Sequence, residues 1–146
     1  MFDDEYVNEN LRKATELSSY RGVAILGEQH FGKINSVTYE LLNWGRTLAD
    51  EMNQPLYCFI LGDNIDNINS LIECGADVVF HVKSPLLENF LPQAYSRAIS
   101  RLVIEEKPAV LIGAATTTGR TVMPLVAATL ETGLTADCTG LTIDPQ

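Results

Sequence analysis

Short apolar runs rich in branched side chains alternate along the chain with longer segments in which apolar residues recur every three or four positions. Short runs of this kind are typical of buried strands, and the wider spacing is typical of amphipathic helices. Alternating strands and helices indicate an α/β fold with an open, mainly parallel sheet between two helical layers. The predicted strands are residues 23–26, 56–61, 78–82 and 109–112, with a weaker fifth strand within 136–143. The second and fourth are apolar enough to be covered on both faces.

Helical spacing predicts a helix between the first two strands, with an apolar stripe that runs from Val37 to Met52. Ser36 is its expected N-cap. A shorter helix over residues 65–72 would stop at Gly75, a residue suited to the left-handed conformation that ends many helices. Two further helices are expected over residues 91–106 and 119–130.

No linker, repeat or low-complexity segment divides the 146 residues. We therefore expect one domain over residues 20–146, preceded by an extension over residues 1–19 in which 8–19 have a sparse helical pattern. The net charge of −9 gives no general attraction to a phosphate backbone, so nucleic acid is not an expected partner. The apolar runs are shorter than the roughly 18 residues of a membrane span, and the acidic start lacks the order of a signal peptide. The chain is expected to be cytoplasmic, without membrane insertion.

The residues that commonly carry metal or nucleophilic chemistry are sparse. Three cysteines have no close pair, so we interpret them as buried reduced thiols rather than a zinc or redox site. Neither His30 nor His81 has a carboxylate at the spacing of a helical metal motif, and His81 falls inside a strand. Asp63 and Asp66 lack the order of a calcium loop, so helix capping explains them better. We expect no metal site and no catalytic residue.

Two loops could still form a ligand site. In an open parallel sheet, ligands bind beyond the carboxyl ends of the strands, where the strand order reverses. If the order is 3-2-1-4-5, residues 27–32 and 113–120 meet at that point. Glu28 and His30 could act there as an acid and base of a nucleotide hydrolase or transferase, but residues two apart at a strand end have nothing to fix them together, which favours solvated turn residues.

The second loop resembles a phosphate cradle. Small residues let the backbone approach a ligand, hydroxyl groups offer donors, and the loop opens onto a helix N-terminus that favours an anion. The spacing is not that of a known phosphate-binding loop, so a tight turn capped by a threonine, with the arginine at the surface or in an ion pair, is the alternative. The candidate cradle consists of Thr116, Thr117, Thr118, Gly119 and Arg120.

Several motifs, in order along the chain, resemble the alpha subunit of electron-transfer flavoproteins. The resemblance begins at Tyr20-Arg-Gly-Val-Ala-Ile-Leu-Gly-Glu-Gln29 and continues through Gly45-Arg-Thr-Leu-Ala-Asp50. It is most specific at Thr132-Gly-Leu-Thr-Ala-Asp-Cys-Thr-Gly-Leu141, which is similar to the anaerobic, bifurcating-type members. Shorter matches lie at residues 32–34, 40–42, 75–77, 107–108, 113–114, 119–120, 124 and 126–128.

This resemblance implies an α/β domain of the adenine-nucleotide alpha-hydrolase-like type. It also implies a heterodimer in which this domain packs against a beta subunit, supports a flavin domain and takes part in electron transfer from acyl-CoA or other dehydrogenases. FAD belongs to the whole complex, and the family's FAD-binding motifs have no counterpart here, so we expect the C-terminal FAD domain to be absent and this chain alone not to hold FAD.

Two further points follow from the resemblance. Relatives usually carry Arg where this chain has Leu125, which removes a charged donor from that position. The family's adenine nucleotide sits in the beta subunit, so residues 116–120 become an inherited turn or an interface element. The alternative function is a free-standing adenine-nucleotide-binding protein of the universal-stress type that would use those residues for the phosphate.

Overall fold

The computed structural model describes residues 19–135. The predicted helix over 8–19, apart from its last residue, the fifth strand within 136–143 and Cys138 lie outside the described residues. The elements are β1 Val23–Leu26, β2 Gln29–His30, β3 Lys33–Ile34, α2 Ser36–Met52, β4 Leu56–Leu61, α3 Ser70–Glu73, β5 Val78–Val82, a 3-10 turn η1 Pro85–Leu87, α4 Pro92–Glu106, β6 Val110–Ile112 and α5 Thr117–Thr129.

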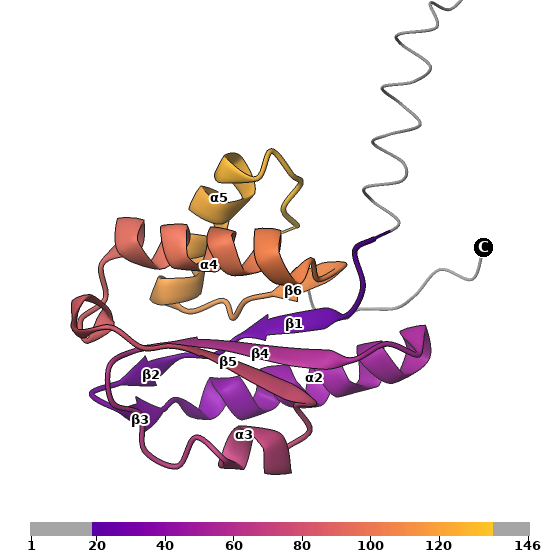
Figure 1. The fold of residues 1–146 in the computed structure, drawn as a ribbon, viewed down its shortest axis with the longest axis horizontal. Coiled ribbons are helices and arrows are strands. Elements are labelled where there is room, and N and C mark those ends of the chain that lie inside the picture. Colours follow the sequence, from indigo (N-terminus) through magenta and orange to yellow (C-terminus); the bar gives the residue numbers. More distant parts are fainter. Residues whose placement is uncertain (1–18, 136–146) are drawn as a thin grey trace, which may run out of the picture.

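Four parallel strands form the sheet, in the order β5-β4-β1-β6 (Figure 1). In chain order these are the third, second, first and fourth predicted strands, so the predicted order is confirmed for the strands that the structure describes. Val23 pairs with Leu56 of β4 on one side and with Val110 of β6 on the other. The short strands β2 and β3 form a separate antiparallel hairpin that the sequence did not predict.

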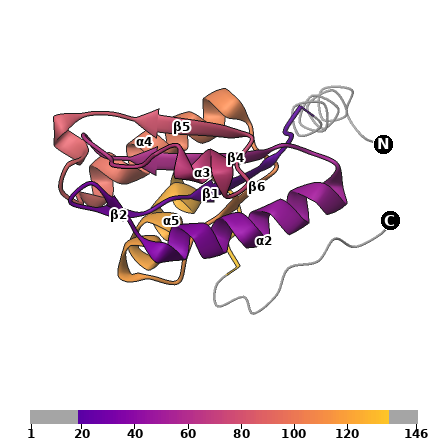
Figure 2. The same ribbon diagram turned by 90° about the horizontal axis from the view of Figure 1, so that it is seen from below.

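Helices cover both faces of this sheet, which makes a three-layer α/β fold (Figures 1 and 2). α2 and α3 lie on one face, and α4 and α5 lie on the other. Alternate residues of β1 point to opposite faces: Ile25 packs with Leu42 of α2, whereas Leu26 packs with Ile99 of α4 and Val122 of α5. β1 is therefore the buried centre of the domain. Within the described residues, no helix is both long and apolar enough to cross a bilayer.

Three local predictions are wrong, and the structure gives the reason for two of them. The N-cap of α2 is Asn35 rather than Ser36, because the Asn35 side chain accepts a hydrogen bond from the Val37 N–H at 3.2 Å. β6 begins one residue later than predicted. Its three residues are half-buried rather than covered on both faces, because β1 is its one strand neighbour in the described sheet.

The helix expected over residues 65–72 is reduced to the four residues of α3. Asn67 has a φ of 60°, in the left-handed region, and so interrupts a continuous helix. The Asp66 N–H also donates to the carbonyl of Gly32 in the hairpin at 2.8 Å, which holds this segment as a turn. Ile65 and Ile68 still pack against the core, so the apolar spacing was correct although the backbone conformation was not.

Candidate functional site

The sheet has its switch point between β1 and β6. The chain passes from β1 to β4 through α2 on one face and returns from β5 to β6 through α4 on the other. The loops that follow β1 and β6 consequently meet at the carboxyl edge, as the strand order predicts. A hydrogen bond between Glu28 and Thr116, 88 positions apart in the sequence, joins these two loops.

Glu28 is a buried carboxylate at this edge, with 8% of the residue exposed. The Thr116 hydroxyl group donates to it and lies 2.8 Å from both Oε1 and Oε2. Thr38 of α2 holds the backbone of Glu28, since its hydroxyl group accepts from the Glu28 N–H at 2.9 Å and lies 3.1 Å from the Glu28 carbonyl. The prediction that Glu28 is a solvated turn residue is therefore wrong.

Burial also changes the acidity of this group. Removal from water raises the pKa of the Glu28 carboxyl above its ordinary value, and the hydrogen bond from Thr116 offsets part of that rise. Glu28 therefore carries its charge at a cost, and the Thr116 hydroxyl group is the side-chain donor that reduces this cost.

Thr116 is the N-cap of α5. Its side-chain oxygen accepts a hydrogen bond from the Gly119 N–H at 3.1 Å while its hydroxyl hydrogen is directed to Glu28. Gly119 is required by packing, because a Cβ atom at this position would overlap the carbonyl oxygen of Ala114. The glycine thus lets the first turn of α5 pack closely against the loop that precedes it.

The other members of the predicted cradle lie in the first turn of α5. Thr117 and Arg120 are exposed, and Thr118 is half-buried. The N–H groups at a helix N-terminus favour a negative charge, and here the Glu28 carboxylate already lies beside them through the capping residue. The geometry therefore favours the interpretation of the loop as a capped turn.

The remaining polar candidates do not join this site. His30 is exposed, and its ring lies against Phe31 with centroids 4.3 Å apart. His81 is half-buried with Nε2 3.0 Å from the carbonyl oxygen of Gly62. Within residues 19–135, no three His, Cys, Asp or Glu side chains are grouped so that they could hold a metal ion.

Gln29 is a positioning residue that the sequence did not reveal. Its Nε2 donates to the Leu61 carbonyl at 3.2 Å, and its Oε1 accepts from the Gly32 N–H at 2.8 Å. The β2–β3 hairpin is thereby tied to the carboxyl end of β4. A polar residue three positions after the end of a buried strand was the available signal, but its partner is 32 positions away.

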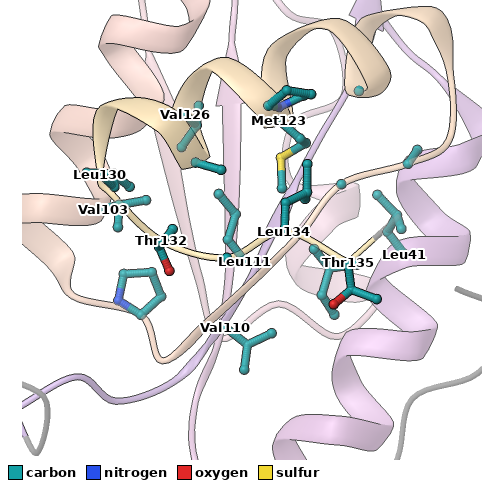
Figure 3. Close-up of a pocket in the computed structure, with 18 of the residues that line it drawn as sticks. Leu41, Val103, Val110, Leu111, Met123, Val126, Leu130, Thr132, Leu134 and Thr135 are labelled. Carbon is teal, nitrogen blue, oxygen red and sulfur yellow. The ribbon is translucent and has the colours of Figure 1, made fainter. Parts of the chain in front are cut away.

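A large groove opens beside β6 (Figure 3). Its volume is roughly 1250 Å³, and most of the side chains that line it are apolar. Among them are residues of β6, α2 and α5, the loops that flank β6, Val103 of α4 and the segment 131–135 that follows α5. In Figure 3, Leu134 of this segment lies near Leu111 of β6 and Met123 of α5. The sequence alone did not predict this groove.

Comparison with known proteins assigns the chain to a family. Residues 23–146 match the family model described as the electron transfer flavoprotein domain. The chain is 43% identical over 129 residues to an electron transfer flavoprotein subunit alpha of Thermoanaerobacterium thermosaccharolyticum, a match that covers 88% of this chain and 39% of the relative. It is 40% identical over 130 residues to Protein FixB of Clostridium saccharobutylicum, with 89% and 39% covered.

A third relative, from Anaerotignum propionicum, is named acryloyl-CoA reductase electron transfer subunit beta; it is 39% identical over 132 residues, with 90% of this chain and 36% of the relative covered. The matched region thus spans about two fifths of the length of these relatives. The parallel sheet between two helical layers agrees with the match, and the resemblance inferred from the sequence motifs is confirmed. The chain belongs to the electron transfer flavoprotein family and is similar to its alpha subunits.

Proposed function

We propose that residues 20–146 are the N-terminal domain of an electron-transfer flavoprotein alpha subunit and act as a structural platform. The domain docks a beta subunit and supports a flavin domain, while the complex receives electrons from an acyl-CoA or other dehydrogenase. The observation that carries the proposal is the similarity to alpha subunits over nearly nine tenths of this chain and about two fifths of theirs.

The site at the carboxyl edge supports a platform rather than a cofactor pocket. A flavin dinucleotide needs donors and positive charge for its pyrophosphate. The first turn of α5 instead faces the Glu28 carboxylate, and the Thr116 hydroxyl group is already committed to that carboxylate. The described residues here do not fit the pyrophosphate of FAD, so we place the flavin of the complex in a part of the alpha subunit outside residues 20–146.

The same contact weighs against the alternative function. A free-standing adenine-nucleotide-binding protein would need the 116–120 turn to hold a phosphate beside a buried carboxylate. An acid–base role for Glu28 with His30 is also disfavoured, because Glu28 is buried against Thr116 whereas His30 lies exposed on the hairpin. We therefore assign no catalytic residue to this domain.

Two measurements separate these functions. Co-expression of the full chain with its cognate beta subunit, followed by purification through a tag on one of them, is expected to yield both proteins. Calorimetric titration with AMP, ADP and ATP is expected to give no binding heat at millimolar ligand. Binding of a nucleotide without capture of the beta subunit would overturn the platform proposal in favour of the alternative.

A further inference from the structure

Among residues 19–135, the two most exposed large apolar side chains both lie at the carboxyl edge of the sheet. Phe31 is 74% exposed at the tip of the β2–β3 hairpin, which follows β1, and Leu86 is 73% exposed in η1, which follows β5. Both segments extend from the end toward which the parallel strands run (Figures 1 and 2). Phe90 and Leu91, which come after η1, are 37% and 50% exposed. We call these four residues the carboxyl-edge patch, and exposed apolar groups of this kind usually mark an interaction site.

The backbone of Phe31 has a conformation that costs energy. Its φ is 48°, in the left-handed region that bulky side chains rarely adopt. The next residue, Gly32, is fixed on both sides, because its N–H donates to Gln29 Oε1 at 2.8 Å and its carbonyl accepts from the Asp66 N–H at 2.8 Å. The surrounding contacts therefore keep a strained residue in place, and such strain is concentrated at functional sites. A ring that is mostly exposed adds little to the core, so the core does not explain why a phenylalanine stands here.

η1 is tied to the same hairpin through α4. Leu87 is buried, with 4% of the residue exposed, whereas its neighbour Leu86 is exposed to solvent. The Tyr95 hydroxyl group of α4 donates to the Leu87 carbonyl at 3.0 Å and also interacts with the side chain of Gln29. Gln29 in turn holds the hairpin through the Gly32 N–H. Phe31 and Leu86 therefore project from two segments that are joined to each other, so their relative position is set before any partner binds.

Rigidity and charge indicate what kind of partner fits the carboxyl-edge patch. A pre-organised patch suits a folded protein, because rigid projections lose little conformational entropy when they enter pockets of a partner. A second copy of this chain would bring another net charge of −9, which opposes self-association. Segments 29–34 and 83–91 carry the exposed Lys33 and Lys83 against one carboxylate, Glu88. The complementary surface is thus apolar at its centre, with carboxylates at its rim.

We propose that the carboxyl-edge patch docks the beta subunit, with Phe31 and Leu86 as the two anchors that enter apolar pockets of that partner. The inference rests on the proposed function, which supplies the partner, and it adds the surface and the residues that make the contact. The strained conformation of Phe31 is retained because its ring contributes to binding and not to the stability of the free domain.

Two measurements on the same variants test this assignment. Calorimetric titration of the full chain with its cognate beta subunit is expected to show that Phe31→Asn and Leu86→Gln each raise the dissociation constant at least about tenfold. Urea denaturation of Phe31→Asn is expected to give an unchanged or higher midpoint, because asparagine adopts the left-handed region more readily than phenylalanine. Weaker binding without loss of stability is the result that a merely structural role for Phe31 does not produce.

Ile104→Gln is the matched control, because Ile104 is 58% exposed and lies near the end of α4 that is remote from the carboxyl edge. Its dissociation constant should stay close to that of the unsubstituted chain. If Phe31→Asn and Leu86→Gln bind as tightly as Ile104→Gln, the assignment is overturned while the platform proposal stands. If the unsubstituted chain forms no complex, the platform proposal fails and the assignment fails with it. A dimer of this chain alone that Phe31→Asn dissociates would overturn the assignment in favour of a second copy.

Discussion

The Thr116 hydroxyl group makes two hydrogen bonds at once, so Thr116→Ala is the sharpest perturbation of the carboxyl edge. The substitution removes the acceptor for the Gly119 N–H at the start of α5. It also removes the donor to the buried Glu28 carboxylate. The backbone contacts between Glu28 and Thr38 remain, because they do not involve Thr116.

The expected cost follows from these two bonds. Loss of an N-cap side chain costs about 1 kcal/mol. A hydrogen bond to a charged group contributes about 1.5–3 kcal/mol, and a buried acceptor left without a donor is destabilising. The two contributions share one oxygen atom and need not add fully. We therefore expect Thr116→Ala to reduce the free energy of unfolding by about 2–4 kcal/mol.

Urea denaturation of the full chain at neutral pH measures this change. Thr116→Ser keeps the hydroxyl group and should retain most of the stability. Thr117→Ala is the matched control: Thr117 is the next residue and is exposed, so its loss should cost less than about 0.5 kcal/mol. In the Glu28→Gln background, Thr116→Ala should cost about 1 kcal/mol less, because the charged acceptor is gone. If Thr116→Ala proved no more destabilising than Thr117→Ala, the assigned role of the Glu28–Thr116 contact would be wrong.

Three further predictions concern the same framework. Gly119→Ala should destabilise the domain by about 3 kcal/mol in urea denaturation, because the new Cβ atom would overlap the Ala114 carbonyl oxygen. Gly133→Ala is the control and should cost less than about 0.5 kcal/mol, because a Cβ atom at Gly133 would meet open space. Equal costs for the two substitutions would refute the packing argument. The pKa of Glu28 is raised by folding, so the stability that this carboxyl group contributes is complete below its ordinary pKa of 4.5 and is lost as the pH rises through the pKa of the folded state. The free energy of unfolding should therefore decrease over that pH range, and Glu28→Gln should remove this decrease in a pH series of denaturation measurements. The pKa of Asp77 is lowered, first by the hydrogen bond from the Leu56 N–H at the start of β4 and also by Arg46 of α2. The stability that Asp77 contributes is therefore present above the ordinary pKa of 3.8 and is lost as the pH falls. Asp77→Ala should cost about 1–2 kcal/mol of unfolding free energy at neutral pH and progressively less in acid, and a cost that does not change with pH would contradict this assignment.

The sheet could be predicted because its strands are encoded locally. The runs at 23–26, 56–61 and 78–82 have the predicted bounds in the structure. Each is short, apolar and bounded by turn residues, so no distant partner is needed to recognise it. The loss of most of the 65–72 helix depends instead on the left-handed conformation of Asn67 and on a backbone bond to Gly32, neither of which the apolar spacing reports.

The site was predictable in position but not in chemistry. The strand order alone brought the loops after β1 and β6 together. The side-chain hydrogen bond of the buried Glu28 comes from Thr116, which lies 88 positions later, and no local pattern links the two residues. The groove beside β6 likewise exists because α2, α5 and the segment 131–135 converge around one strand, an arrangement that appears only once the tertiary structure is assembled.

The platform proposal is tested most directly by mixing the purified full chain with its cognate beta subunit at micromolar concentration and measuring the mass of the product by size-exclusion chromatography with light scattering. A heterodimer of one copy of each chain is expected, formed without added nucleotide or flavin bound to this chain. Two separate species with the masses of the free proteins would contradict the central claim that this domain docks the beta subunit.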